Sequence, residues 1–271
     1  MGFGGWPNAA EISTITITYL KNKLRARKFG EIKPEKFYEF STLRPFGTIR
    51  RGTIRKIELP SNSFFFVRNE DAESDVIFFL GVEPHLNWTE YLDCLMEVVQ
   101  RFNVRRIITV GGTYDRVPHT HEPIVSALVN FPALWNELRK YRIVPSDYEG
   151  PISIHTMLLD RGRREGVEAI SLWGHAPHYI QMQNPKVAFH VTRRLVKILK
   201  LDVDLSDLEE AGRQFDLELE RMLAQKPEIQ DYVRRLEEEY REPASLELPE
   251  TEEIIQEVEE FLKGKEEKEG E

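Results

Sequence analysis

The sequence has 271 residues, enough for one large domain with an appendage. Apolar residues make up 41% and charged residues 31% of it, which is typical of a globular protein, and the net charge of −9 disfavours a general binder of nucleic acid or anionic membranes. The single cysteine, Cys94, excludes an internal disulfide. Since no apolar run has the length of a membrane span and no leader opens the chain, we expect a cytoplasmic protein that binds neither nucleic acid nor membrane.

The first part of the chain predicts one helix and three strands. A helix is expected from about Ala9 to Leu24, and Asn8 followed by Glu11 is typical of a capping box at its start. Strands are expected at Phe37–Phe40, Thr53–Leu59 and Phe64–Val67. Because apolar and polar residues alternate imperfectly along 53–59, we interpret that strand as part of an exposed hairpin.

A βαβ unit follows and is the clearest signal in the sequence. The uninterrupted apolar run Val76–Leu80 predicts a strand buried on both faces, and Ile107–Val110 predicts a second one. Between them, apolar residues recur at helical spacing from Trp88 to Phe102. Strand, helix and strand in this order form a crossover, so we expect a parallel sheet with these two strands as neighbours and the helix on one face.

The remaining elements of the α/β region are shorter. They are expected to be a strand at Ile124–Leu128, a short helix at Ala133–Lys140 and a late strand at Ala169–Trp173 that ends at Gly174. Asn184 followed by Pro185 predicts the start of another helix, because proline at the first helical position gives up no N–H that the helix needs.

The composition changes after Asp202, where charged residues become dense. Ser206 and Glu209 form a capping-box pattern at the start of one helix, and a second helix is expected at Pro227–Tyr240. We therefore divide the chain into an α/β domain, residues 1–203, a pair of helices, residues 204–242, and a linker with an acidic, charged tail, residues 243–271. We expect the helices to pack on the main domain and to contribute to a homo-oligomer contact.

The segment after the second buried strand, residues 111–123, carries the most chemistry. Ligands of open α/β sheets bind at the carboxyl ends of parallel strands, and two glycines there would leave backbone N–H groups accessible to an anion. A second polar segment, after the strand that ends at Trp173, would reach the same edge. The candidate ligand-binding residues are Gly111, Gly112, Thr113, Asp115, Arg116, His119, His121, Trp173 and His178.

Two interpretations of this polar segment stay open. Its side chains can bind a ligand, or they can satisfy one another within a structured loop, which we favour. We expect no metal, because His119 and His121 lack the helical spacing of metal-binding histidines. We also expect no cofactor, since Gly2-Phe3-Gly4-Gly5 matches no nucleotide-binding fingerprint. No Gly-x-Ser-x-Gly elbow is present, and no Ser-His-Asp arrangement is recognisable.

Several short motifs together resemble a known family. They are Gly4–Glu11, Phe79–Pro84, Val117–Thr120 after Gly111-Gly112, Tyr148–Pro151, Ser171–Tyr179 and Asn184–Lys186. The first resembles the Gly-Trp-x-Asp/Asn-Ala opening of the proteasome assembly chaperone 2 family, the second its Leu-x-Gly-x-Glu-Pro turn, and the third its signature loop. In order and spacing the matches run from Gly4 to about Tyr240, and they are closest to the long actinobacterial and archaeal form with extra C-terminal helices.

The resemblance implies a three-layer αβα fold with a mostly parallel sheet, similar to nucleoside phosphorylases, in proteins that self-associate. Some relatives act as assembly factors for proteasomes or related complexes. Long-form members are sometimes labelled ATP-grasp proteins, but this sequence has no ATP-grasp nucleotide motif. The family has an apolar first strand before its Gly-Trp turn, and in this sequence, which begins Met1-Gly2-Phe3, we expect that strand to be missing or mostly missing.

Two functions are consistent with these patterns. The first is a non-catalytic, homo-oligomeric protein similar to assembly chaperones, whose partners are copies of itself and a proteasome-like or other protein complex. The second is an enzyme or sensor that binds a nucleoside or a phosphorylated small molecule at the carboxyl edge of the sheet. We favour the first, because the sequence shows no recognisable catalytic set.

Overall fold

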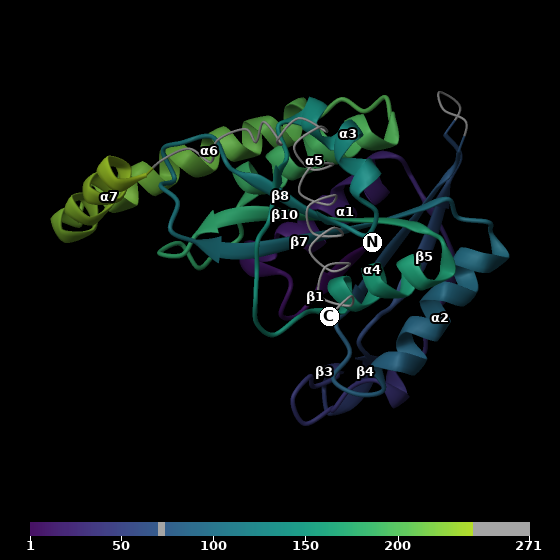
Figure 1. The fold of residues 1–271 in the computed structure, drawn as a ribbon. Coiled ribbons are helices and arrows are strands. Elements are labelled where there is room, and N and C mark those ends of the chain that lie inside the picture. The colour runs from purple at the N-terminus through teal and green to yellow at the C-terminus, as the bar shows by residue number, and fades with distance from the viewer. Residues whose placement is uncertain (70–73, 241–271) are drawn as a thin grey trace, which may run out of the picture. The chain divides into compact units, whose positions relative to one another are not determined.

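An eight-stranded sheet organises the described residues, 1–69 and 74–240, of this computed structural model (Figure 1). Its strands are β1 (Gly2–Gly4), β2 (Arg27–Glu31), β5 (Ser63–Val67), β6 (Val76–Val82), β7 (Arg106–Asp115), β8 (Val125–Val129), β9 (Val144–Pro145) and β10 (Glu168–Pro177). They lie in the order β2-β5-β6-β1-β7-β10-β8-β9. The central strands β6, β1, β7 and β10 are parallel neighbours, whereas β2, β5 and β6 pair antiparallel on one side and β10 pairs antiparallel with β8 on the other.

Helices cover both faces of this sheet and give the expected three layers. They are α1 (Ile12–Lys23), α2 (Trp88–Arg101), α3 (Trp135–Leu138), α4 (Ile154–Glu165) and α5 (Pro185–Leu199), followed by α6 (Ser206–Leu223) and α7 (Pro227–Glu239). One hydrophobic core lies between the sheet and α1, α3 and α5, and a second lies between the sheet and α2 and α4. Figure 1 shows α5 and α6 above the sheet and α2 and α4 below it. The expected αβα fold with a C-terminal helical extension is therefore confirmed.

The chain to Tyr240 packs as one compact unit that includes both C-terminal helices. Asp216 of α6 forms an ion pair with Lys186 of α5 at 2.8 Å, and the hydroxyl of Tyr19 in α1 donates to the backbone oxygen of Asp204. The packing of these helices on the main domain is thus confirmed. The expected linker and tail lie outside the described residues. Among the described helices, none is both long enough and apolar enough to span a membrane.

The central strand β1 bears on two expectations. Gly2–Gly4 forms a strand of three residues, which pairs in parallel with Leu80–Val82 of β6 and, through Gly2, with Val110 of β7. The strand before the Gly-Trp turn is therefore not missing outright, and its three residues agree with a strand that is mostly missing. It also separates β6 from β7, so the expectation that these two are direct neighbours is wrong. They are parallel, as expected, and α2 connects them on one face.

Strands β7 and β10 continue through the glycines that were expected to end them. β7 runs to Asp115 and β10 runs to Pro177, paired in register along their whole length. A Cβ at Gly111 would lie 2.7 Å from Cε3 of Trp173, and one at Gly112 would lie 2.4 Å from the backbone oxygen of Ala9. These glycines permit close packing inside the sheet, so the expected loop at residues 111–114 is wrong.

Three smaller expectations are also wrong. Phe37 and Tyr38 are buried in a loop instead of a strand, because the Tyr38 hydroxyl donates to Val82 O at 2.7 Å and fixes the loop in the core. Residues 9–11 form a 3₁₀ turn (Ala9–Glu11), and α1 begins at Ile12, where Oδ1 of Asn8 accepts from the N–H of Thr14. In α6 the carboxylate of Asp204 accepts from both the N–H and the hydroxyl of Ser206, so the expected capping box does not form.

A two-stranded hairpin lies outside the main sheet. It consists of β3 (Phe46–Arg50) and β4 (Thr53–Glu58), paired antiparallel. Nearly all of its residues are exposed, which confirms the expectation of an exposed hairpin at 53–59. Figure 1 shows the hairpin at the lower edge of the view, far from α6 and α7.

Candidate functional site

The carboxyl ends of β7 and β10 meet, as the sequence predicts for the two polar segments. Asp115 lies beside Pro177 at the ends of the two strands. The N–H of His178 donates to the backbone oxygen of Asp115 at 3.0 Å, and His178 Nδ1 lies 3.0 Å from the same oxygen. Asp115, His119 and His178 therefore belong to one region, whereas Gly111, Gly112 and Thr113 lie further back, within the strand.

The first polar chain at this edge joins Asp115, His175 and Ser126. Oδ2 of Asp115 lies 2.7 Å from Nδ1 of His175, and Nε2 of His175 lies 2.8 Å from Oγ of Ser126. The hydrogen bond to His175 lowers the pKa of Asp115 below its ordinary value. His175 lies in the second polar segment that the sequence predicts at this edge, but no local pattern relates it to Ser126, which lies 49 residues earlier and was not predicted.

These three residue types also form the catalytic triad of serine hydrolases, so their surroundings decide what they can do. Ser126 is only 3% exposed. It lies within β8, where it pairs with Trp173 of β10 on one side and with Val144 of β9 on the other. A substrate carbonyl has no route to this hydroxyl in the structure. The chain of hydrogen bonds therefore cross-links β7, β10 and β8 rather than presenting a nucleophile.

A second polar group surrounds Tyr179, just beyond β10. The Tyr179 hydroxyl accepts from the N–H of His119 at 2.9 Å and lies 2.7 Å from Nδ1 of the same histidine. Burial, together with the nearby charge of Lys186, lowers the pKa of His119, and burial raises the pKa of Tyr179 to about 12. Both side chains are therefore neutral near pH 7, and they tie the 116–123 segment to the end of β10.

Helix α7 covers this edge of the sheet. The hydroxyl of its Tyr232 lies 3.0 Å from Nε2 of His178, and the rings of Tyr232 and Tyr179 pack at 5.9 Å. Further contacts join α7 and the residue after it to the 116–123 segment: Arg116 to Glu239 at 3.0 Å, the Thr120 hydroxyl to Glu237, and the His121 ring to that of Tyr240 at 4.9 Å. The predicted ligand edge is thus occupied by the chain's own C-terminal helix.

The space left beneath this cover is small. A cavity of about 10 Å³ lies between the 117–124 segment, α5, α6 and Tyr240, with His119, His175 and Lys186 among its lining residues. That volume holds about one water molecule. Pockets for nucleosides and other small molecules are typically about 300 Å³ or larger. The edge therefore has no room for such a ligand in this conformation.

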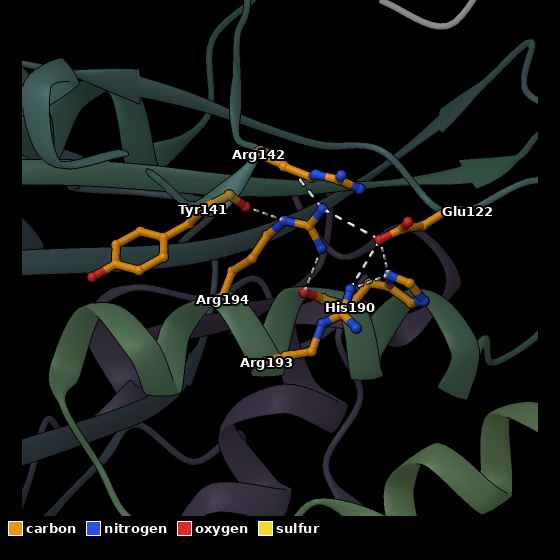
Figure 2. A network of polar contacts seen from close by, with 6 residues as sticks. All are labelled: Glu122, Tyr141, Arg142, His190, Arg193 and Arg194. Atoms are coloured by element: carbon orange, nitrogen blue, oxygen red, sulfur yellow. Dashed lines mark hydrogen bonds and ion pairs between the residues drawn. The ribbon is translucent and has the colours of Figure 1, made fainter. Parts of the chain in front are cut away.

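A charged network anchors the far end of the polar segment (Figure 2). Oε1 of Glu122 lies 2.9 Å from a guanidinium nitrogen of Arg193, 3.2 Å from Nδ1 of His190 and 3.7 Å from a guanidinium nitrogen of Arg194. The Arg194 side chain is buried and donates to the backbone oxygens of Tyr141 and Arg142 and of His190 in its own helix. This network joins the segment before β8, helix α5 and the turn before β9.

Burial and neighbouring charges set the ionisation of this network. Burial, and next the charge of Arg193, lower the pKa of His190 to about 4, so this ring is neutral near pH 7. Burial acts to raise the pKa of Glu122, but the interaction with His190 and the charges of the cations Arg193, Arg194 and Arg142 outweigh it, and the pKa is lowered. Glu122 is therefore an anion that balances buried positive charge. Glu122 belongs to the polar segment 111–123 that the sequence singles out, whereas no pattern in the sequence points to His190.

The other predicted site residues lie in different surroundings. The Trp173 ring packs at 5.2 Å from the ring of the buried His155, on the side of the second core. Arg116 is exposed and pairs with Glu239 across the cover. Among the described residues, no group of three or more His, Cys, Asp or Glu side chains is placed to hold a metal ion.

Comparison with known proteins gives the family. The model of the PAC2 family matches residues 2–223. The chain belongs to the PAC2 family. A proteasome-assembly chaperone homologue of Mycobacterium tuberculosis is 27% identical, with a TM-score of 0.78 over 86% of this chain and 98% of that one. A PAC2 family protein of Streptomyces avermitilis is 26% identical, with a TM-score of 0.73 over 81% and 93% of the two chains.

A more distant solved structure shares the PAC2 fold. PbaB of Pyrococcus furiosus, an archaeal proteasome activator, is 24% identical, with a TM-score of 0.65 over 80% of this chain and 90% of that one. No curated protein matches the chain.

One motif of this PAC2 family chain has a clear structural role. Oε1 of Glu83, in the Glu83-Pro84 turn after β6, accepts from the N–H of Ile154 at the start of α4 at 2.8 Å. The hydroxyl of Ser153 accepts from the next N–H, that of His155. A carboxylate at a helix N-terminus satisfies an N–H that would otherwise lack a partner. The motif therefore fixes the entry of α4 against β6.

Proposed function

We propose that this PAC2 family protein is a non-catalytic, homo-oligomeric protein that acts like an assembly chaperone in the cytoplasm, with copies of itself and a proteasome-like complex as partners. Family membership supports the chaperone-like role. The names of two relatives point in the same direction, since one is a homologue of a proteasome-assembly chaperone and the other is a proteasome activator. The complex that this chain would serve is inferred from those names.

The covered carboxyl edge of β7 and β10 carries the non-catalytic part of the proposal. Asp115, His119 and His178 all have hydrogen-bond partners within the chain, and α7 lies over them. A binding site leaves some polar groups free for its ligand, whereas a structural network satisfies them internally. The cavity of about 10 Å³ supports the second description.

Exposed apolar side chains on α6 support the homo-oligomeric part. Leu217 and Met222 are 47% and 48% exposed, although α6 buries Leu208 and Leu219 against the rest of the chain. Leu217 and Met222 lie at different angles around α6, with Leu217 on the side opposite the buried Leu208 and Leu219, and a second copy would remove such side chains from water. The contribution of α6 and α7 to an oligomer contact is part of the proposal.

Analytical ultracentrifugation of the full chain tests the oligomeric state, with a chain ending at Asp204 and a Leu217→Ser/Met222→Ser variant beside it. We expect the full chain to sediment as an oligomer and both altered chains to sediment as monomers. The double-serine variant should keep the circular dichroism of the full chain, and the Asp204-terminated chain should keep that of its remaining domain. A folded Asp204-terminated chain that keeps the oligomeric state of the full chain would remove α6 and α7 from the interface. A monomeric full chain would overturn the homo-oligomer altogether.

The chaperone role needs a separate measurement. Native gels of the proteasome-like particles from the source cells, with and without the gene for this chain, would compare assembly intermediates with finished particles. We expect intermediates to accumulate when the chain is absent and to return to normal with the Ser126→Ala variant, which removes the hydroxyl of the triad-like chain. Restoration by this variant would support a non-catalytic role, and failure of a folded variant to restore assembly would contradict it.

The ligand-binding alternative, at Gly111–His121 and Trp173–Tyr179, is tested by thermal shift with nucleosides, nucleotides and phosphate. A ligand that binds the folded state raises the melting temperature in a saturable way. We expect no such rise. A saturable rise that Arg116→Ala abolishes would favour an enzyme or sensor, with α7 moving aside to admit the ligand.

A further inference from the structure

The hairpin β3–β4 exposes large apolar side chains to water, which is unfavourable for an isolated two-stranded hairpin. Phe46, Ile49, Ile54 and Ile57 are each between 62% and 66% exposed. No residue from 49 to 59 is buried. A lone two-stranded hairpin is only marginally stable in water, because it has too little apolar surface to bury. An exposed apolar hairpin of this kind is typical of a contact surface.

A bulge gathers the isoleucines of the hairpin on one face. Thr48 pairs with Lys56, but the next pair is Ile49 with Ile54, so Arg55 is an extra residue in β4. In a regular strand Ile54 and Ile57, three positions apart, would point to opposite faces. Paired residues share a face, and Ile57 pairs with Gly47, two positions from Ile49 in β3. The bulge therefore places Ile49, Ile54 and Ile57 together.

The hairpin is strongly basic, although the chain as a whole is acidic. Residues 44–58 contain five basic residues and one acidic residue, a net charge of +4 in a chain of net charge −9. Within the described residues, Lys56 forms an ion pair with Glu58, whereas Arg50, Arg51 and Arg55 have no ion-pair partner. The hairpin thus presents an apolar face and, at its turn and on its opposite face, arginines that have no ion-pair partner among the described residues.

Charge decides which surface of a second copy fits this hairpin. Two hairpins in contact would bring two charges of +4 together, and like charges across an interface are unfavourable. Residues 204–240 contain twelve acidic and five basic residues, a net charge of −7, and they include the exposed Leu217 and Met222. The C-terminal helices therefore offer both the opposite charge and uncovered apolar side chains.

We infer that the β3–β4 hairpin of one copy docks on α6 and α7 of the next copy, with its isoleucines on the outward-facing Leu217 and its arginines toward acidic residues of those helices. The contact is between copies, because the hairpin and the C-terminal helices of one chain lie on opposite sides of the molecule (Figure 1). Such a head-to-tail contact uses two different surfaces, so it closes into a ring when the rotation permits. The inference rests on the proposed homo-oligomer and specifies its interface.

Charge reversal in the full chain tests this interface by analytical ultracentrifugation. An Arg50→Glu/Arg55→Glu variant and a Glu218→Lys/Glu228→Lys variant should each sediment near the monomer mass of 31.7 kDa. A chain that carries all four changes should recover the oligomer, because the opposite charges face each other again. The control is Arg101→Glu/Lys140→Glu, which reverses two exposed basic residues elsewhere and should leave the oligomer intact.

The outcomes separate this inference from the proposed function. An oligomer that persists in the charge-reversed hairpin variant and in Ile49→Ser/Ile54→Ser overturns the hairpin contact, while the homo-oligomer itself stands. Loss of the oligomer in the Arg101→Glu/Lys140→Glu control would also overturn the inference, since the effect would then be one of general charge. A monomeric wild-type chain would overturn both the inference and the proposed homo-oligomer. Circular dichroism of each variant should match that of the wild type, because the altered side chains are exposed.

Discussion

The covered edge at Asp115 and the exposed β3–β4 hairpin show opposite uses of side chains. At the edge, titratable residues that resemble a ligand site have partners within the chain, and a helix covers them. In the hairpin, exposed apolar residues and arginines of an unremarkable sequence have no packing or ion-pair partner among the described residues. In this protein, the cluster of titratable side chains at the Asp115 edge therefore indicates a structural network. The exposed hairpin is the better place to look for a functional surface.

The largest expected effect, on soluble folding, comes from introducing one aspartate into the core and comparing it with one aspartate in the hairpin. Phe79→Asp should abolish soluble folding, because Phe79 is fully buried between β5 and β1 and a carboxylate there has no partner. Ile54→Asp should leave a soluble, folded protein, since Ile54 is 64% exposed. Expression in the soluble fraction and circular dichroism measure both. A folded Phe79→Asp variant would show that this side chain does not belong to the core.

Adding a single methyl group should change the free energy of unfolding by different amounts in the sheet and in the hairpin. Gly112→Ala should lower the free energy of unfolding by roughly 1–3 kcal/mol, because its Cβ would lie 2.4 Å from the backbone oxygen of Ala9 and the chain must shift. Gly47→Ala in the hairpin has no atom within 4 Å of the new Cβ and should change the free energy by less than about 0.5 kcal/mol. Urea denaturation of both variants makes the comparison, and equal losses would contradict it.

Acid should weaken the covered edge through His190. The folded-state pKa of about 4 lies below the unfolded value near 6.5, so the unfolded chain binds a proton first as the pH falls. The stabilisation is complete above pH 6.5 and is lost progressively toward pH 4, by about 1–2 kcal/mol between pH 7 and pH 5. Urea midpoints across this range should fall less steeply in His190→Asn. An identical slope in the variant would exclude this residue as a source.

The smallest expected effect concerns the ion pair across the cover. Arg116 and Glu239 are 70% and 65% exposed, so Arg116→Ala should cost at most about 0.5 kcal/mol of stability. Tyr232→Phe, which removes the less exposed hydrogen bond to His178, should cost about 1 kcal/mol. Thermal melts of both variants rank the two contacts. A larger loss in Arg116→Ala would mean that the cover is held mainly by surface charge.

Local sequence patterns predicted the helices and strands whose signals lie within the element itself. The apolar run Val76–Leu80, the helical spacing from Trp88 and the Asn184-Pro185 start all correspond to elements of the structure, and Asn184 does accept from the N–H of Val187. Helix α4 was missed although Ser153 caps its start and Gly166 ends it with a positive φ of 72°. Those signals were present in the sequence.

Other features depend on contacts that no local pattern records. Gly111 ordinarily suggests the end of a strand, but here it makes room for Trp173, which lies 62 positions later in the chain. The cover over the candidate site joins Arg116 to Glu239, across 123 positions. Sequence reasoning found the polar residues and the edge that they share, but the partners that satisfy them follow only from the assembled fold.

The three residues of β1 impose an order on how the chain is made and folded. Their partners are residues 80–82 and 110, so the middle of the sheet stays open until more than a hundred further residues have been synthesised. Pairing over such separations raises the contact order and slows folding. Phe3 is fully buried in the finished fold. Until the later strands have been synthesised, the core that buries it does not exist. A protein inferred to assist assembly therefore completes its own central strand late.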